Sequence, residues 1–248
     1  LCLVCSVIVA GAAVGLRQKQ NENKANDKKA AVLQAAGLYQ ADVPVAEQFK
    51  QVTTRIVNLE AGRFATESEL DEIRAANLNP DNFDQRKSSK LPALSRKLSG
   101  AEDKPSIKRL EKYAAVYMVE KNGTIDTLVL PVHGYGLWST LYGFLALEAD
   151  GNTVSGITFY EHTETAGLGG EVDNPAWKAK WPGKQIYASN GGVAMRVIKG
   201  AVDPNAAEAI HQVDGLSGAT LTSKGVENLI AYGLGDEGYG PLLGSLSG

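Results

Sequence analysis

The 248-residue chain is poor in the residues that hold metals, with two cysteines and three histidines. Cys2 and Cys5 are too few for a disulfide framework, a four-cysteine zinc site or a cysteine-ligated iron–sulfur cluster. Three histidines also leave little room for a histidine-rich centre. We therefore expect no metal site in this chain.

The chain also lacks an excess of positive charge and the common nucleotide-binding motifs. Its 25 Lys and Arg stand against 28 Asp and Glu, and no basic block occurs, which argues against a nucleic-acid-binding protein. No GxxxxGK[ST], HExxH or GxSxG sequence is found, and Gly167-x-Gly169 lacks the third glycine of a dinucleotide fingerprint. His162-Thr163-Glu164 matches only half of the zinc-deaminase signature. Nucleotide hydrolysis, zinc hydrolysis and serine-esterase chemistry thus lose their usual support.

The chain begins with an uncharged apolar segment. Residues 1–16 contain no charged side chain, and residues 17–29 are almost wholly polar. A helix of that length reaches about 24 Å, short of the roughly 30 Å hydrocarbon core, and the first residue is not Met, so we expect the end of a longer apolar helix. A signal peptide cleaved near Ala10-Gly11-Ala12 and a buried core helix are the alternatives. Apolar residues all round and the abrupt charged boundary favour a transmembrane helix over residues 1–18.

The periodicity of the remaining chain predicts an α+β fold. A helical stalk is expected over residues 19–40, with Gly37 as its C-cap, and residues 63–109 read as an irregular surface excursion or a mobile insertion. Asn122-Gly123 and Asp150-Gly151-Asn152 predict hairpin turns. We therefore expect one antiparallel sheet with helices packed against it. Strands are expected at 55–59, 114–119, 125–132, 141–148, 154–160 and 193–199, and helices at 45–52, 174–180, 206–213 and 223–234.

Three glycine-bearing segments, 133–139, 164–171 and 214–220, are the candidates for chemistry. The last contains Ser217-Gly218-Ala219-Thr220, directly before a predicted helix, whose unpaired N–H groups and positive dipole end favour a phosphate. Gly218 and Ala219 are small enough for a large group to approach the backbone, and Thr220 adds a hydroxyl. An ordinary N-cap formed by Ser and Thr explains the same residues, and both interpretations stay open at this point.

Residues 214–223, DGLSGATLTS, resemble the flavinylation motif D-x-x-[ST]-G-A-T of the covalent FMN-binding domain family. The similarity extends to residues 130–139, 150–156 and 167–177. Together with the apolar start, these segments resemble the C subunits of sodium-translocating NADH:quinone oxidoreductases over essentially the whole chain, most weakly over 63–109. The G subunits of Rnf-type ferredoxin:NAD oxidoreductase complexes share the SGAT element and are less similar elsewhere. The resemblance implies an FMN-binding core over residues 113–248, preceded by a helix, strand and polar excursion over 41–112.

The resemblance further implies that Thr220 carries FMN through a phosphoester. A magnesium-dependent flavin transferase would install the group from FAD and read the motif around Asp214 and Ser217. Thr222 is also hydroxylic but lies outside the GAT triplet. The other expected cofactor-binding residues are Asp214, Leu216, Ser217, Gly218, Ala219, Trp138, Glu164, Thr165, Gly167, Leu168, Gly169 and Lys199.

A flavin ring is a flat apolar plate with a polar edge, which suggests a role for each of these segments. Residues 165–169 are expected to reach the ring edge through backbone N–H groups, and Trp138 or Trp177 to pack on the ring or the ribityl chain. Core packing is the alternative for both tryptophans and is favoured for Trp177. Lys199 is expected either to stabilise negative charge on the flavin or simply to end a strand in solvent.

The predicted function is one-electron transfer within a respiratory complex of the bacterial inner membrane. The expected partners are other subunits of the complex, the lipid bilayer and, during maturation, the flavin transferase. No NADH fingerprint is present, so the chain is not expected to oxidise NADH alone, and sodium transport needs membrane carboxylates that a single span lacks. The basic residues that follow the apolar segment would be cytoplasmic by the positive-inside rule, whereas the family places the main domain in the periplasm, and we adopt the family placement. A flavin-free periplasmic interaction module, with SGAT only a helix cap, is the alternative from another class.

Overall fold

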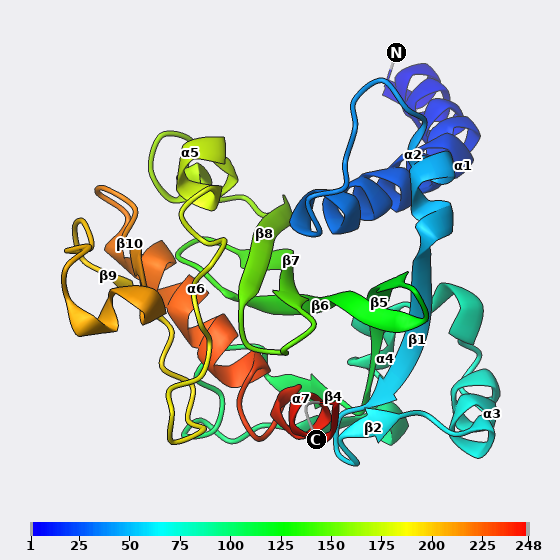
Figure 1. The fold of residues 1–248 in the computed structure, drawn as a ribbon. Coiled ribbons are helices and arrows are strands. Elements are labelled where there is room, and N and C mark those ends of the chain that lie inside the picture. The colour runs from blue at the N-terminus through cyan, green and yellow to red at the C-terminus, as the bar shows by residue number, and fades with distance from the viewer. Residues whose placement is uncertain (1, 247–248) are drawn as a thin grey trace.

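Alternating apolar residues build a six-stranded antiparallel sheet at the centre of the molecule (Figure 1). The structure is a computed structural model that describes residues 2–246. The strands follow the order β2-β1-β5-β6-β7-β8 and are β1 (Val52–Asn58), β2 (Arg63–Phe64), β5 (Tyr113–Lys121), β6 (Thr124–Tyr135), β7 (Thr140–Glu148) and β8 (Val154–Glu161). Asn122 and Gly123 have φ values of 54° and 80°, the two positive angles that a type I′ turn requires. The predicted α+β class and antiparallel sheet are confirmed.

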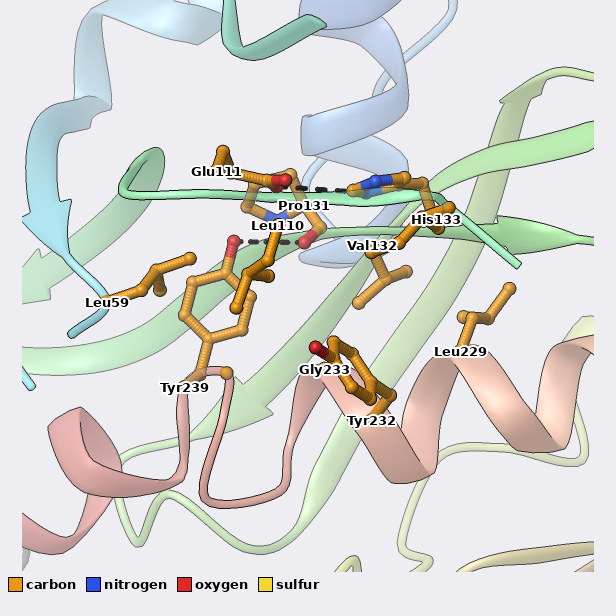
Figure 2. Close-up of a pocket in the computed structure, with 12 residues that line it drawn as sticks. Leu59, Leu110, Glu111, Pro131, Val132, His133, Leu229, Tyr232, Gly233 and Tyr239 are labelled. Carbon is orange, nitrogen blue, oxygen red and sulfur yellow. Dashed lines mark hydrogen bonds and ion pairs between the residues drawn. The ribbon is translucent and has the colours of Figure 1, made fainter. Parts of the chain in front are cut away.

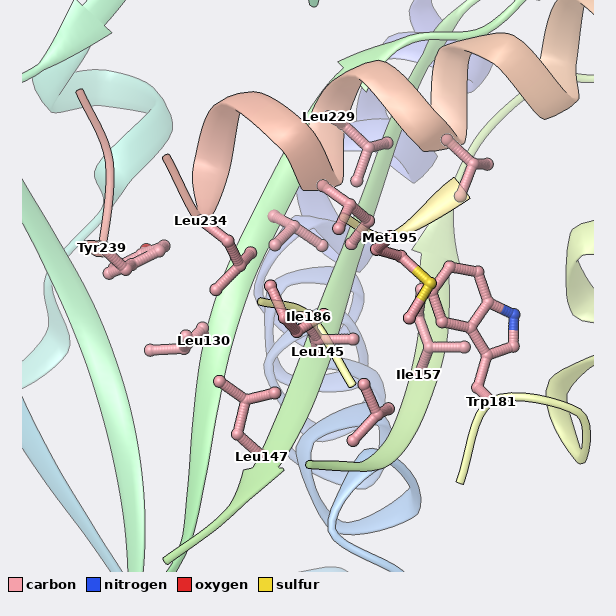
Figure 3. Close-up of a cluster of buried hydrophobic side chains, with 14 of the residues drawn as sticks. Leu130, Leu145, Leu147, Ile157, Trp181, Ile186, Met195, Leu229, Leu234 and Tyr239 are labelled. Atoms are coloured by element: carbon pink, nitrogen blue, oxygen red, sulfur yellow. The ribbon is translucent and has the colours of Figure 1, made fainter. Parts of the chain in front are cut away.

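One face of the sheet is covered by α6 (Thr220–Gly233), which crosses β6 (Figure 1). Leu130, Leu145 and Leu147 point from the strands toward Leu229 of α6 and toward Trp181, Ile186 and Met195 of the long connection (Figure 3). This layer is the largest apolar cluster among the described residues, and it packs α6, which carries part of the site described below, against the sheet. Beside it lie α5 (Pro175–Lys178), the parallel pair β9 (Arg196–Ile198) and β10 (Gln212–Asp214), and α7 (Gly240–Leu246).

The opposite face is covered by the end of α1 (Cys2–Ala35), whose Val32 and Leu33 are fully buried. Gly37 has φ 69°, and the amides of Gly37 and Leu38 donate to the carbonyls of Gln34 and Leu33, which is a Schellman ending. The predicted helix and its glycine cap are therefore confirmed.

The beginning of α1 presents its apolar side chains to solvent. Val4, Val7, Val9, Val14 and Leu16 are each more than half exposed. Across residues 2–246 no helix is both long and apolar enough to span a membrane. The transmembrane helix predicted over residues 1–18 is thus not supported, and Leu1 lies outside the described residues.

Residues 63–109 are ordered rather than a mobile insertion. They form α3 (Glu67–Ala75), α4 (Gln85–Ser88), β3 (Ser95–Lys97), which pairs with β4 (Arg109–Glu111), and two short 3₁₀ turns, Pro80–Asn82 and Pro92–Leu94. Ile73, Phe83 and Leu94 form a small second core against Ile56 and Tyr113 of the sheet. The apolar residues of this segment are too widely spaced to give a periodic signal, which is why the sequence indicated only an excursion.

Several predicted elements differ from the structure. Residues 206–213 form a 3₁₀ turn, Ala207–His211, followed by strand β10, instead of one helix. The helix expected over 45–52 is shorter, with α2 (Val45–Gln48) followed by a 3₁₀ turn and with Val52 already in β1, and the strand expected over 193–199 covers only β9. The helix expected from residue 223 begins at Thr220. This last difference matters most, because it places Thr220 itself in the first turn of α6.

Candidate functional site

The first turn of α6 is not capped by any side chain of the described residues. Ala219 occupies the N-cap position, with φ −127° and ψ 52°, and an alanine side chain cannot accept hydrogen bonds from the N–H groups of the first turn. Ser217 and Gly218 are exposed, and Gly218 has φ 70°, which turns the chain into the helix. The interpretation of SGAT as an ordinary Ser/Thr cap is therefore wrong, and the positive end of α6 faces solvent beside Thr220.

Two threonines of the motif lie in opposite environments. Thr220 is exposed at the first position of α6. Thr222 is fully buried, and its hydroxyl donates to Glu164 Oε2 at 2.6 Å. Only Thr220 of this pair offers a hydroxyl to a large group arriving from solvent.

Glu164 is the buried centre around which three segments meet. It is 8% exposed, and its carboxylate accepts the backbone N–H groups of Leu137 (3.2 Å), Trp138 (2.9 Å) and Ser139 (3.1 Å) as well as the Thr222 hydroxyl. Burial raises the pKa of Glu164, but the hydrogen bonds from Thr222 and from these backbone groups outweigh it, so the pKa lies below its usual value. The carboxylate therefore stays ionised and ties the turn after β6 to α6.

Glycines make the room that this arrangement needs. A Cβ on Gly136 would lie 2.8 Å from Glu164 Oε1, and a Cβ on Gly169 would lie 2.7 Å from Oε2. A Cβ on Gly218 would lie 3.0 Å from Leu168 Cδ2, so the two predicted glycine segments touch at the surface. The structure thus brings together residues 136–139, 164–169 and 216–222.

Exposed apolar side chains lie on, or directly beside, the three segments that meet at Glu164. Trp138 is 64% exposed, Leu221 60% and Leu168 43%, and Leu137 and Tyr135 are also partly exposed. Side chains of this kind in solvent, next to a hydroxyl and a positive helix end, fit a ligand with an anionic group and a flat apolar plate. The sequence singled out Trp138 and Leu168 but missed Tyr135, Leu137 and Leu221, since a single apolar residue does not indicate whether its side chain is buried or exposed.

The other residues of the motif are supports. Leu216 is buried and its N–H donates to Ser223 Oγ at 2.9 Å, and Ala219 is also buried. The Asp214 carboxylate accepts from the Lys180 ammonium and, at 2.9 Å, from the Val202 N–H. Burial raises the pKa of Asp214, and these two donors lower it further than burial raises it, to below the usual value. Through these two contacts, Asp214 holds the chain segment that leads into the motif.

The remaining predicted residues are placed as follows. Thr165 and Gly167 are exposed, with Gly167 at φ 74°, and the Leu168 N–H is engaged by the Thr165 carbonyl at 3.1 Å. Trp177 is buried and its indole N–H donates to the Asp214 carbonyl at 2.8 Å, as core packing predicts. Lys199 is exposed at the end of β9, where the backbone passes Gly215 next to the motif.

A small pocket lies at the other end of α6 (Figure 2). It is lined by Leu229, Tyr232 and Gly233 of α6 and by β4 and β6, about 18 Å along the helix from Thr220 at the usual rise. Tyr239 donates to the Pro131 carbonyl at 3.0 Å there, and Glu111 faces His133 at 3.9 Å. The cavity is too small and too far from the motif to hold the ligand that fits around Thr220.

The comparisons with known proteins agree with this geometry. The FMN-binding domain family matches residues 136–235, which include all three glycine segments from Gly136 onward. The C subunit of the Na(+)-translocating NADH-quinone reductase of Pseudomonas aeruginosa is 51% identical over 99% of this chain and 92% of its own length. The corresponding protein of Vibrio parahaemolyticus is 46% identical over 98% and 90%.

Two solved structures share the fold. The crystal structure of Shewanella oneidensis NqrC superposes with a TM-score of 0.79 at 32% identity and covers 91% of this chain and 98% of that one. The C subunit of the Na(+)-translocating NADH-quinone reductase from Parabacteroides distasonis gives a TM-score of 0.66 at 25% identity, with 92% and 96% covered. The chain belongs to the family of C subunits of Na(+)-translocating NADH-quinone reductases.

Proposed function

We propose that this chain carries FMN on Thr220 and transfers single electrons between redox centres of a Na(+)-translocating NADH-quinone reductase. The observation that carries the proposal is the contrast between the two threonines, one exposed at an uncapped helix end and one sealed against Glu164. The first turn of α6 offers N–H groups to a phosphate, and the exposed apolar side chains of the neighbouring segments offer a surface on which the flavin ring can pack. FMN supplies one-electron chemistry when bound, and this chain supplies its position, its hydrogen bonds and the local charge.

Attachment requires a partner enzyme, a magnesium-dependent flavin transferase acting on FAD. The Thr220 oxygen forms a bond to the flavin-side phosphorus, the phosphorus–oxygen bond to the AMP half breaks, and AMP leaves while the hydroxyl proton passes to the transferase. No electron is gained or lost in this step. Ser217 and Thr220 are exposed, so an enzyme can reach the segment without unfolding α6, and Asp214 holds it in shape from inside.

The ring is held by the three segments that meet at Glu164. Trp138 and Leu168 provide apolar surface, the exposed backbone of residues 165–167 provides the polar edge, and Lys199 places a positive charge beside the motif. These groups keep the flavin next to the protein surface, where the other members of the complex can approach it. The chain has no second nucleotide motif, so NADH oxidation belongs to another member of the complex.

The apolar beginning of α1 is the part we assign to the membrane. Its valines at positions 4, 7, 9 and 14 and Leu16 are exposed, and basic residues follow from Arg17. We place this segment in the bacterial inner membrane as a single-pass anchor and residues 113–248 in the periplasm as the FMN-binding core, with 19–40 as the stalk between them. Lipid and other subunits of the complex are then its partners.

The proposal is tested by the covalent label. In a host that expresses the transferase, intact-mass analysis should show an FMN adduct that is absent from Thr220→Ala and retained in Thr222→Val. In-gel fluorescence under denaturing conditions gives the same answer independently. An unlabelled intact chain would favour the flavin-free interaction module, whereas a label that survives Thr220→Ala would refute Thr220 as the attachment site.

A further inference from the structure

The Glu164 carboxylate is a buried negative charge that is balanced by hydrogen-bond donors instead of a cation. Among residues 2–246 no Lys or Arg forms an ion pair with it. Three consecutive backbone N–H groups, of residues 137–139, and the Thr222 hydroxyl all point at it. Such a set of donors compensates the carboxylate and leaves a fixed charge in the protein.

Each of the three segments around Thr220 touches this one group. The turn that carries Trp138 donates to it, the loop 165–169 continues directly from it, and α6 reaches it through Thr222, two residues after Thr220. Glu164 and Thr222 are 58 positions apart in sequence, so no local interaction replaces the contact. Gly136 and Gly169 lie so close to the carboxylate that a Cβ at either position would approach one of its oxygens to less than 3 Å.

We propose that Glu164, held by the Thr222 hydroxyl, is a positioning residue that fixes Trp138 and Thr220 relative to one another and lowers the midpoint potential of FMN bound there. This inference rests on the proposed function, because it assigns roles around a flavin on Thr220. The positioning part follows from the hydrogen bonds. The potential follows from charge, since a fixed negative charge near the ring disfavours the reduced, more electron-rich flavin. Thr222 is therefore a donor to Glu164 and not a second attachment point.

The test compares Glu164→Gln with a matched pair at the donor, Thr222→Val and Thr222→Ser. Gln keeps the size of Glu164 and removes its charge, Val keeps the shape of Thr222 without the hydroxyl, and Ser restores the hydroxyl. Three quantities are measured on the intact chain: the fraction carrying FMN by intact mass, the midpoint potential by spectroelectrochemical titration, and the exchange rates of the Leu137–Ser139 amides.

We expect Glu164→Gln to shift the midpoint potential positively and to speed exchange of these amides about tenfold or more, the loss expected when bonds to a charged acceptor weaken. Thr222→Val should speed exchange to a smaller extent and lower the labelled fraction, and Thr222→Ser should behave like the unaltered chain. A merely structural role would not give a positive potential shift in Glu164→Gln.

The two proposals fail in different ways. If the intact chain carries FMN on Thr220 but Glu164→Gln keeps its potential and exchange rates, the role of Glu164 is refuted and the carrier function stands. If the intact chain carries no FMN, the carrier function fails, and unaltered exchange in Glu164→Gln would refute the positioning role as well. If Glu164→Gln does not fold, the Thr222→Val and Thr222→Ser pair decides: equal exchange rates and equal labelled fractions in the two refute the inference.

Discussion

Gly225 shows how closely α6 approaches the strand that leads into the site. A Cβ at this position would overlap the Tyr135 carbonyl oxygen and lie 2.9 Å from Gly136 Cα, both of them backbone atoms. Gly→Ala inside a helix normally stabilises it by about 1 kcal/mol, but here the helix must move, and we expect Gly225→Ala to lower the free energy of unfolding by about 1–3 kcal/mol. Gly233→Ala is the matched control, because its Cβ would meet only Val132 Cγ1 at 3.8 Å. Urea titrations measure both, and a Gly225→Ala as stable as Gly233→Ala would contradict the close contact.

His162 and Asp173 give the site a pH-dependent support. His162 Nε2 lies 2.8 Å from Asp173 Oδ2, and this hydrogen bond raises the pKa of His162 against the effect of burial, with the charges of Asp173 and Glu164 acting in the same direction. A raised folded-state pKa adds stability that is fully present below the ordinary value of about 6.5 and is lost as the pH rises through the raised value. Asp173 is half exposed, so Asp173→Asn should cost less than about 1 kcal/mol at pH 5.5 and almost nothing at pH 9.

The measurement is urea unfolding at the two pH values, with His162→Gln as the background control. In that background the effect of Asp173→Asn should no longer depend on pH. If Asp173→Asn lowers the free energy of unfolding more at pH 9 than at pH 5.5, the pKa of His162 is not raised by Asp173 and the prediction is wrong.

Among the elements, local patterns predicted the sheet well and the connections poorly. The five predicted strands from Arg55 to Tyr160 are all present, because alternation and the Asn122-Gly123 turn are local signals. The second core around Ile73 was not predicted, since its members come together only through the sheet. The start of α6 was placed three residues late, because the small residues of SGAT read as a loop while the structure begins the helix at Thr220.

The second core should behave as a separately opening part of the fold. Ile73 of α3 is fully buried against residues of β1 and β5, and no residue of this cluster belongs to the site. Ile73→Ala should cost about 2–5 kcal/mol locally and speed amide exchange over residues 67–97, while β7, β8 and FMN attachment are unaffected. Ala75→Ser, on the exposed side of the same helix, is the control. Hydrogen-exchange mass spectrometry measures this protection. If β7 and β8 lose as much protection as residues 67–97, the fold opens as one cooperative unit instead.

Over the whole molecule, the candidate site was found in sequence as three glycine segments but not as one structure. The segments around Gly136, Gly167 and Gly218 were recognised separately, and the contact between Gly218 and Leu168 follows only from the fold. The hydrogen bond between Glu164 and Thr222 has no sequence signature, because a Glu and a Thr that do not contact each other look the same in a sequence. The residue types thus indicated which segments form the candidate site. Their relative positions follow from the packing of α6 on β6, which the sequence does not show.

Helix α1 has two parts that should separate cleanly in truncation. Its described side chains up to residue 27 are exposed, whereas Ala31, Val32, Leu33 and Ala35 are buried on the sheet, with Ala35 against Gly156. A chain starting at residue 28 should keep its free energy of unfolding and still accept FMN. One starting at residue 39 loses Val32 and Leu33 from the core and should be less stable by at least about 4 kcal/mol.

The same pair of truncations tests the assignment of the apolar segment. Urea unfolding and intact mass follow stability and labelling, and sedimentation with membranes follows localisation. If residues 1–16 anchor the protein, the intact chain sediments with membranes and the chain from residue 28 stays in the supernatant although its site is intact. Sedimentation of both would move the membrane contact to the folded part. Equal stability of the two truncations would mean that the end of α1 only rests on the sheet, in conflict with the complete burial of Val32 and Leu33.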